Sequence, residues 1–169
     1  MKLNIGCGEH VKEGYLNVDI EHHEGVDMMA AAENLPFDNN SFEKIIATNI
    51  LEHVEDLVSV MKELHRVLKP EGIIRIISPH YTSSGSWKDP THKRALSVET
   101  FTYFVKGHRN SKYYRFGFGF SSIKTRLRFG RKMPLNWVVS PLANRFPKIY
   151  ESTFLSAFPC MDMVVELKK

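Results

Sequence analysis

An α/β fold with a mostly parallel sheet is predicted by three features of the chain. The first is a short apolar run that opens into the turn Gly6-Cys7-Gly8. The second is an acid, Asp19, at the end of the next apolar run. The third is the order that follows, in which β-type runs flank one strongly amphipathic segment. A Gly-x-Gly turn lets the backbone approach a ligand, and a carboxylate at a strand's carboxyl end can accept both hydroxyls of a ribose.

The first strands are separated by links too short for helices. The expected strands are Lys2-Ile5, Tyr15-Ile20 and Val26-Met29. Parallel neighbours usually need a crossover of a dozen residues or more, and residues 9–14 and 21–25 leave room only for turns. One face of the sheet is therefore expected to have reduced helices. Because a parallel sheet is normally buried on both faces, we expect the late segment 131–160, or a second protomer, to cover this one.

A fourth strand is expected at Phe42-Thr48, followed by an amphipathic helix at Asp56-Lys69. Asp56 is a good N-cap, and Pro70 with Gly72 supplies a stop. The apolar positions keep the i, i+3, i+4 spacing of a buried stripe. They are Leu57, Met61, Leu64 and Leu68, with Val54 and Val58 beside them. His65 on this helix is expected at the surface or the boundary.

The next strand, Gly72-Ser78, ends in Pro79-His80-Tyr81. Ligands of open α/β sheets bind beyond the carboxyl ends of strands, so His80 and Tyr81 are expected beside an acceptor. The small polar loop 82–87 is expected to be a mobile lid. Residues 89–94 then lead to a helix that starts near Ser97 and turns Phe101, Phe104 and Val105 inward.

The last third of the chain is basic and aromatic. Alternation over residues 123–129 predicts a strand with one apolar and one cationic face. The cationic positions are Lys124, Arg126 and Arg128. Residues 133–158 are too apolar for a free loop and are predicted to form an inserted helical hairpin. Met161-Leu167 is then the last strand.

Length and composition fit one globular domain. The chain has 169 residues, 43% of them hydrophobic and 25% charged. We expect a single domain over 1–169, with 109–160 as its basic, insertion-rich part. Its two cysteines give neither a disulfide framework nor a metal motif, and no segment has the length and hydrophobicity of a signal or a membrane span, so a cytoplasmic setting is expected.

Positive charge is concentrated late in the chain. Residues 1–99 carry a net charge of −6, whereas residues 100–150 contain 11 lysines and arginines and no acid. Nucleic acid, an anionic membrane surface, a pyrophosphate-bearing substrate or an acidic partner would suit such a segment. Alternatively, the segment forms a basic surface that only aids solubility.

Several motifs follow the opening turn in a fixed order: Ala32-Glu33-Asn34-Leu35-Pro36-Phe37, Ser41-Phe42-Glu43, Leu51-Glu52-His53 and Leu68-Lys69-Pro70-Glu71-Gly72. Over residues 3–78 the set resembles the class I S-adenosylmethionine-dependent methyltransferases, and among them the type 11 subgroup. The resemblance implies a Rossmann-like three-layer fold with an antiparallel last strand.

The resemblance also implies S-adenosylmethionine as cofactor and a set of residues around it. Gly6, Cys7 and Gly8 are expected beside the methionine part, and Asp19 on the ribose. The adenine would be bordered by Ala32, Glu33 and Leu35, and the fourth strand would add Thr48 and Asn49. Ala31 stands where many relatives have an adenine-binding Asp, and this change lowers the expected cofactor affinity. Asn4 stands where relatives often have an acid, a departure that is common in the subgroup.

Two other activities fit the residues poorly. The nicotinamide dinucleotide fingerprint requires a third glycine, here at position 11, and an acid about 20 residues further on. Position 11 is Val and Asp19 comes too early, so a dehydrogenase is rejected. The Asn/Asp-Pro-Pro-aromatic signature of exocyclic amine methylation is missing after the fourth strand, where Thr48-Asn49-Ile50-Leu51 stands.

Methyl transfer needs alignment of donor and acceptor, and a base only where the acceptor must lose a proton. The candidate bases are His80 and His92, with Tyr81 and Arg94 as positioning groups. His22 and His23 lack further spaced ligands, so no metal is expected.

The predicted activity is therefore methylation of a small-molecule, glycan-linked or lipid-linked acceptor, with negative charge nearby and an oxygen as the atom methylated. The alternatives are an RNA methyltransferase that uses the basic stretch 106–132, and a non-catalytic domain that binds the cofactor or a partner through residues 133–158. Peripheral membrane contact and a homodimer are also left open.

Overall fold

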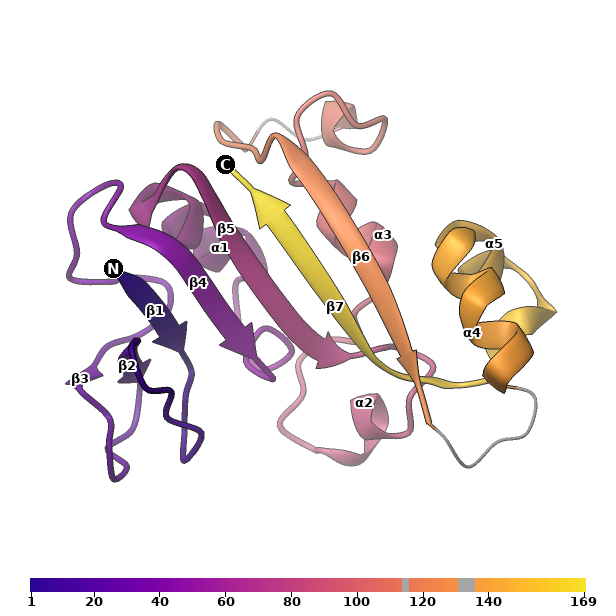
Figure 1. Ribbon diagram of the computed structural model, residues 1–169, viewed down its shortest axis with the longest axis horizontal. Coiled ribbons are helices and arrows are strands. Elements are labelled where there is room, and N and C mark those ends of the chain that lie inside the picture. The colour runs from indigo at the N-terminus through magenta and orange to yellow at the C-terminus, as the bar shows by residue number, and fades with distance from the viewer. Residues whose placement is uncertain (114–115, 131–135) are drawn as a thin grey trace.

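Seven strands of the described residues form one sheet in the computed structural model (Figure 1). The structure describes residues 1–113, 116–130 and 136–169. The strand order is β3-β2-β1-β4-β5-β7-β6. The strands are β1 (Lys2–Ile5), β2 (Leu16–Asp19), β3 (Met28–Met29), β4 (Phe42–Thr48), β5 (Leu68–Pro79), β6 (Ser122–Phe129) and β7 (Cys160–Lys168). Neighbours from β3 to β5 are parallel, and β7 is antiparallel to both β5 and β6. The predicted fold class is confirmed, including its antiparallel last strand.

The helices are short. They are α1 (Leu57–Val67), α2 (Gly85–Lys88), α3 (Val98–Thr102), α4 (Asn136–Arg145) and α5 (Pro147–Ser152), with 3-10 turns at Ser111–Tyr113 and Phe154–Ala157. Asp56 caps α1 as predicted, because its Oδ1 accepts hydrogen bonds from the backbone N–H groups of Val58 (2.9 Å) and Ser59 (3.1 Å). The helix predicted to start near Ser97 is α3, and the structure shows that the Ser97 side chain caps it.

Two details of α1 were predicted wrongly. Val58 is 36% exposed, and the buried stripe instead includes Val60 and Val67. The helix ends at Val67, since Leu68 is already extended and begins β5. Pro70 and Gly72, which were expected to stop the helix, therefore lie within the span of β5, where Glu71 has a φ of 66°.

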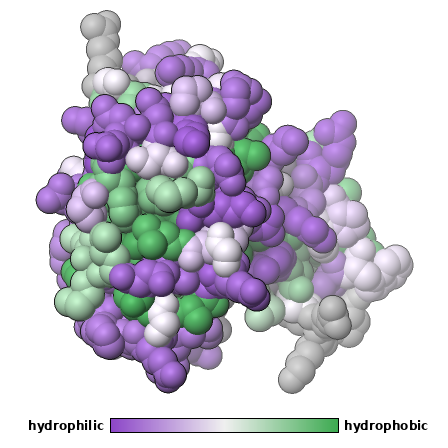
Figure 2. All heavy atoms as spheres, turned by 60° about the vertical axis from the view of Figure 1, so that its left-hand side comes forward, coloured by the Kyte–Doolittle hydropathy of each residue, from purple (hydrophilic) through white to green (hydrophobic). Residues whose placement is uncertain are grey.

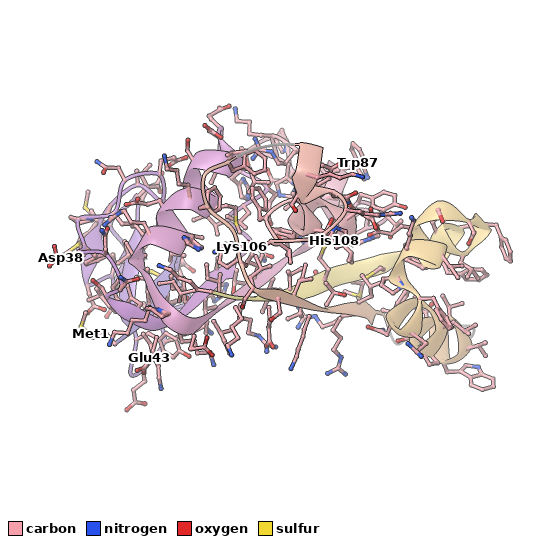
Figure 3. All side chains as sticks on the ribbon, turned by 90° about the horizontal axis from the view of Figure 1, so that it is seen from above. Met1, Asp38, Glu43, Trp87, Lys106 and His108 are labelled. Carbon is pink, nitrogen blue, oxygen red and sulfur yellow. The ribbon has the colours of Figure 1, made fainter. Side chains whose placement is uncertain are left out.

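One face of the sheet forms the core. A cross-strand row on this face joins Leu3, Ile45, Ile74 and Leu167, all with 0% exposure. Helix α1 packs against this face with Met61 and Leu64 fully buried. Seen from above, α1 lies on one side of the sheet, while long polar side chains extend from the other (Figure 3).

The opposite face is not covered by any helix of the described residues, which confirms the expected reduction. The late segment does not cover the first strands, so that prediction was wrong: α4 packs beside β6 at the far end of the sheet (Figure 1). Asn144 explains this position, because its side chain accepts from Leu127 N at 2.8 Å and donates to Leu127 O at 2.9 Å, pairing the edge of β6. Residues 131–135 of that segment lie outside the described residues. Cover by a second protomer stays a prediction.

Apolar side chains are left exposed where the early helices are reduced. Ile20 is 68% exposed and Met29 is 59% exposed at the β2 and β3 end. Figure 2, which brings this end of the molecule forward, shows green apolar residues among purple polar ones.

The cationic face of β6 is confirmed, but acids of β7 lie next to it. Lys124 stands opposite Glu166 in the register of the two strands, and Glu166 is paired with Arg75 at 2.6 Å. Arg128 pairs with Asp162 at 3.0 Å. The surface is therefore mixed in charge, although residues 100–150 contain no acid, because cross-strand neighbours come from elsewhere in the chain.

His65 lies at the boundary of the core, as predicted. Its ring contacts those of Phe118 and Phe120, with centroids 5.5 Å and 5.1 Å away. Burial, and then the nearby Lys169 ammonium, lower the pKa of His65 to about 4. His65 is therefore neutral in the folded protein at any pH where the fold is ordinarily studied.

We expect His65 to reduce stability in mild acid. Between pH 6.5 and pH 4 the unfolded chain protonates this imidazole while the folded chain does not, so the free energy of unfolding falls as pH falls. After discounting for partial exposure, the loss is about 1–2 kcal/mol. Urea unfolding at pH 5 and pH 7.5 measures it in wild type and in His65→Phe. The variant should lose less stability between the two pH values; equal losses would contradict the assignment.

Candidate cofactor and acceptor site

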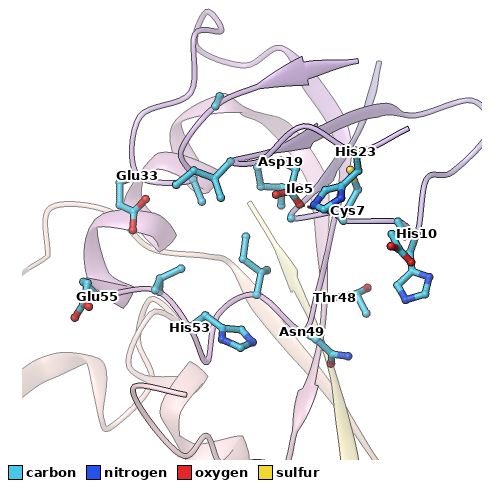
Figure 4. A pocket seen from close by; sticks show the side chains of 18 residues that line it. Ile5, Cys7, His10, Asp19, His23, Glu33, Thr48, Asn49, His53 and Glu55 are labelled. Carbon is cyan, nitrogen blue, oxygen red and sulfur yellow. Dashed lines mark hydrogen bonds between the residues drawn. The ribbon is translucent and has the colours of Figure 1, made fainter. Parts of the chain in front are cut away.

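A cavity of about 720 Å³ opens at the carboxyl ends of β1, β2 and β4. This size suits a cofactor or small ligand. Eight of the ten predicted cofactor residues line it: Gly6, Cys7, Gly8, Asp19, Ala32, Glu33, Thr48 and Asn49. Asp19 and Cys7 lie on one wall, with His53 and Asn49 across from them (Figure 4).

The glycine turn is held in place by β2. The backbone N–H groups of Gly6 and Cys7 both donate to Val18 O, at 2.8 Å and 3.3 Å. Gly6 has a φ of 64°, and an added Cβ there would come within 2.5 Å of Ile50 Cδ1. Glycine is thus required at position 6 by both backbone conformation and space.

Asp19 fixes the other side of the turn. Its Oδ2 accepts from Gly8 N at 2.7 Å, and its Oδ1 accepts from Glu21 N at 3.1 Å. A carboxylate has about four acceptor positions. Each oxygen of Asp19 therefore keeps one for a ligand hydroxyl.

The cavity is acidic. Within the described parts of the chain, its lining includes four carboxylates and neither lysine nor arginine. These acids are Glu9, Asp19, Glu33 and Glu55. Such a field favours a cationic ligand such as a sulfonium and disfavours a pyrophosphate. Burial, and then the Asp19 carboxylate, raise the pKa of the Cys7 thiol, so Cys7 contributes a neutral wall.

Two predicted cofactor residues lie outside this lining. Asn4 is 2% exposed, and its Nδ2 donates to His10 O at 3.0 Å and to Asn17 Oδ1 at 2.9 Å. It supports the loop after the glycine turn. Leu35 is 3% exposed in the core, and its N–H donates to Glu63 Oε1 at 2.8 Å.

The structure does not bring His80 and Tyr81 to the cavity. His80 is 0% exposed, with Nε2 2.9 Å from Glu151 Oε1 and Nδ1 2.9 Å from Thr82 Oγ1. A buried imidazole with both nitrogens bonded is unsuited to take a proton from an acceptor. The Tyr81 hydroxyl donates to Glu151 O at 2.9 Å, so both residues fasten α5 to β5. In the loop expected to be a lid, Trp87 is 69% exposed and its Nε1 donates to Tyr81 O.

His92 and Arg94 lie behind the cavity wall. The rings of His92 and His53 meet edge to face with centroids 4.6 Å apart, and His53 lines the cavity. Arg94 donates to the backbone carbonyls of Leu51, Val54 and Glu55, at 3.2 Å for Leu51 and 2.8 Å for Glu55. Arg94 thus holds the loop that carries His53.

Sequence reasoning missed His53 as a site residue. It was part of a motif, Leu51-Glu52-His53, but was given no role. The available signal was its position just after the fourth strand, since residues there face the ligand in open α/β sheets. His10, His23 and Ile50 also line the cavity and were not predicted.

The strand order and the cavity position define a class I methyltransferase fold. Solved S-adenosylmethionine-dependent methyltransferases share it: one from Archaeoglobus fulgidus has a TM-score of 0.65 at 20% identity, covering 99% of this chain and 85% of that one. Another from Thermotoga maritima, described as a possible histamine N-methyltransferase, has a TM-score of 0.64 at 18% identity, covering 99% and 81%. At such identities the likeness shows the fold.

Residues 3–76 match the model of the methyltransferase domain family. Residues 3–76 are thus similar to a methyltransferase domain and lie in a class I methyltransferase fold, and this similarity and the fold together imply S-adenosylmethionine as cofactor. This confirms the predicted resemblance.

Matches to curated relatives are local. Demethylmenaquinone methyltransferase of Chlorobaculum parvum is 46% identical over 61 residues, which are 36% of this chain and 23% of that protein. The mitochondrial arginine-hydroxylase of Mus musculus is 35% identical over 95 residues, covering 43% of this chain and 27% of that protein. The chain thus spans about a quarter of the length of these relatives. No helix within the described ranges has the length and hydrophobicity needed to span a bilayer.

Proposed function

We propose that this protein transfers a methyl group from S-adenosylmethionine to an oxygen of a small-molecule, glycan-linked or lipid-linked acceptor. The observation that carries the proposal is the acidic cavity, which is lined by eight of the ten predicted cofactor residues. The name of the demethylmenaquinone methyltransferases, which refers to a small-molecule acceptor, supports that class of substrate. Since β6 and β7 complete the sheet that residues 3–76 begin, we also propose one domain over residues 1–169.

The proposed arrangement places the two ends of the cofactor on different elements. Gly6 to Gly8 hold the methionine part, and the free acceptor positions of Asp19 receive the ribose hydroxyls. The acceptor enters on the wall of His53 and Asn49. The bound cofactor would supply the methyl carbon, to which the acceptor oxygen would bond as the carbon–sulfur bond breaks. The electron pair of the broken bond would stay on sulfur, and the hydroxyl proton would leave to water. Alignment of the reacting atoms in a dry site supplies much of the rate.

Removing the Asp19 carboxylate is expected to weaken cofactor binding about 30-fold, which is about 2 kcal/mol and typical of hydrogen bonds to a charged group. Calorimetric titration of S-adenosylmethionine and its demethylated product into wild type and Asp19→Ala measures this loss. Asp27→Ala is the matched control, because Asp27 also accepts from a backbone N–H (Asn17, 2.7 Å) but lies outside the cavity lining.

The proposal is supported if wild type and Asp27→Ala bind S-adenosylmethionine with similar affinity and Asp19→Ala does not. Binding unaffected by Asp19→Ala would contradict the proposed cofactor position. Cofactor binding without turnover of any hydroxyl acceptor in a radiolabelled methyl screen would favour the non-catalytic alternative.

RNA methylation through residues 106–132 is the second candidate, but the mixed charge around β6 speaks against it. Asp162 and Glu166 stand beside the cationic side chains that would meet phosphates. RNA binding through phosphates would weaken steeply as salt rises.

A further inference from the structure

Three metal-ligating side chains meet behind the acceptor wall of the cavity. Glu52, His53 and His92 each offer one ligand atom, and these atoms lie within 4.8 Å of one another. Glu52 and His53 follow β4, whereas His92 comes from the segment between α2 and α3. Ligand atoms bonded at about 2.1 Å to one ion lie about 3–4 Å apart. Small side-chain rotations are enough to bring these three onto a common ion.

Within the described residues, both histidines form their hydrogen bonds through Nδ1 and not through Nε2. His92 Nδ1 is 3.0 Å from Ser86 O, a carbonyl that can only accept, so Nδ1 carries the proton. Thr91 Oγ1 donates its hydrogen to Asp89 Oδ1 at 2.6 Å, and it must therefore accept from His53 Nδ1 at 3.0 Å. Imidazoles that bind metals usually donate their other N–H to such a partner, which fixes the ligating nitrogen.

Glu52 gives an independent indication. It is 2% exposed, and its Oε2 accepts from Ser78 Oγ at 2.8 Å. Its Oε1 is buried and has no hydrogen-bond partner among the residues that the structure describes. A buried acceptor without a partner is costly, and a buried carboxylate calls for a positive charge. A cation between Glu52 and the histidines would provide one.

We propose that Glu52 Oε1, His53 Nε2 and His92 Nε2 bind a divalent transition-metal ion. Two imidazoles and one carboxylate are the ligand set of catalytic zinc and of non-haem iron sites, which keep coordination positions open. Asp89 faces the same place, with Oδ2 3.8 Å from His92 Nε2. The expectation of no metal considered the two cysteines and then His22 and His23, none of which belongs to this cluster.

The ion's role rests on the proposed function, but its binding does not. Because His53 belongs to the cluster and also lines the cavity, an ion held there would lie near the acceptor wall. The ion would act as a Lewis acid, so that an acceptor hydroxyl would lose its proton to water more readily before its oxygen bonds to the methyl carbon. This supplies the deprotonation for which His80 is unsuited.

Calorimetric titration of the metal-free protein with Zn²⁺, without cofactor, tests the site. We expect one ion per chain at micromolar or lower dissociation constant, and at least a 30-fold loss in Glu52→Gln and in His92→Gln. His10→Gln is the matched control, since His10 lines the cavity outside the cluster and should leave binding unchanged. Mg²⁺, which prefers oxygen ligands, should bind much more weakly.

Nitrogen NMR of the imidazoles gives a second readout on the folded wild type. Nε2 of His53 and His92 should be unprotonated without metal and should shift on adding Zn²⁺. Absence of Zn²⁺ binding, or equal loss in His10→Gln and His92→Gln, would overturn the proposal. If Glu52→Gln lowers the melting temperature, His92→Gln and the NMR shifts decide the outcome. Titration with S-adenosylmethionine is scored separately, so failure of the metal site and failure of the cofactor site are distinguishable.

Discussion

Gly6→Ala is expected to weaken S-adenosylmethionine binding 100-fold or more. A side chain at a φ of 64° costs about 1–2 kcal/mol. The added Cβ also meets Ile50, with Cδ1 at 2.5 Å and Cβ at 2.8 Å. Because the Cβ of Ile50 is involved, rotation of its side chain cannot relieve the contact, and the backbone of one cavity wall must move. That displacement disturbs the turn proposed to hold the methionine part of the cofactor.

Gly14→Ala is the matched control for this substitution. Gly14 has a φ of 75°, so alanine suffers a similar backbone strain there. An added Cβ at Gly14 meets no atom within 4 Å, and the residue does not line the cavity. Chemical unfolding should show about 1 kcal/mol of destabilisation in Gly14→Ala with unchanged cofactor affinity. Equal affinities in the two variants would mean that the turn does not contact the cofactor.

Elements with a strong local pattern were predictable. The bounds of β1 and β4 agree with the structure residue for residue, because each is a short apolar run between clear turn signals. The start of α1 follows from Asp56, whose side chain satisfies backbone N–H groups within three residues. Alternation also gave the two faces of β6. In each case the deciding interactions lie close together in sequence or repeat with a fixed period.

Features that depend on distant parts of the chain were not predictable in the same way. His80 follows β5 at a position typical of ligand-binding residues, yet Glu151, 71 positions later, closes over it. Nothing near His80 in the sequence indicates that partner. The acids beside the cationic face of β6 were not foreseen for the same reason, since they belong to β7. The position of α4 depends on Asn144 pairing with the β6 edge, which the apolar pattern does not reveal.

The residues of the candidate site differ in the same way in how far they could be predicted. The cofactor residues come from motifs at the ends of neighbouring parallel strands, so their order predicts their proximity. The contact between His53 and His92 joins two loops 39 positions apart and is fixed by hydrogen bonds to Thr91 and Ser86. Arg94 was expected to position the acceptor, whereas the structure shows it donating to backbone carbonyls of the loop at 51–55.

Arg94→Ala is expected to lower the free energy of unfolding by about 3 kcal/mol. Its guanidinium donates to three carbonyls of the loop at 51–55, and hydrogen bonds from a charged donor contribute about 1.5–3 kcal/mol each without being additive. Removing the side chain takes the guanidinium donor away from all three carbonyls at once. Thermal and urea unfolding measure the loss.

Two further variants separate a loop-positioning role of Arg94 from direct contact with the acceptor. Lys93→Ala removes a neighbouring charge whose ion pair with Glu55 is exposed, so it should change stability little. Arg94→Lys keeps the charge but not the planar fork, and should still lose about 2 kcal/mol. Because the same loop carries His53 and Glu55 into the cavity, Arg94→Lys should also weaken cofactor binding about tenfold before any acceptor is added. Unchanged stability and cofactor affinity, with activity lost, would instead assign Arg94 to the acceptor.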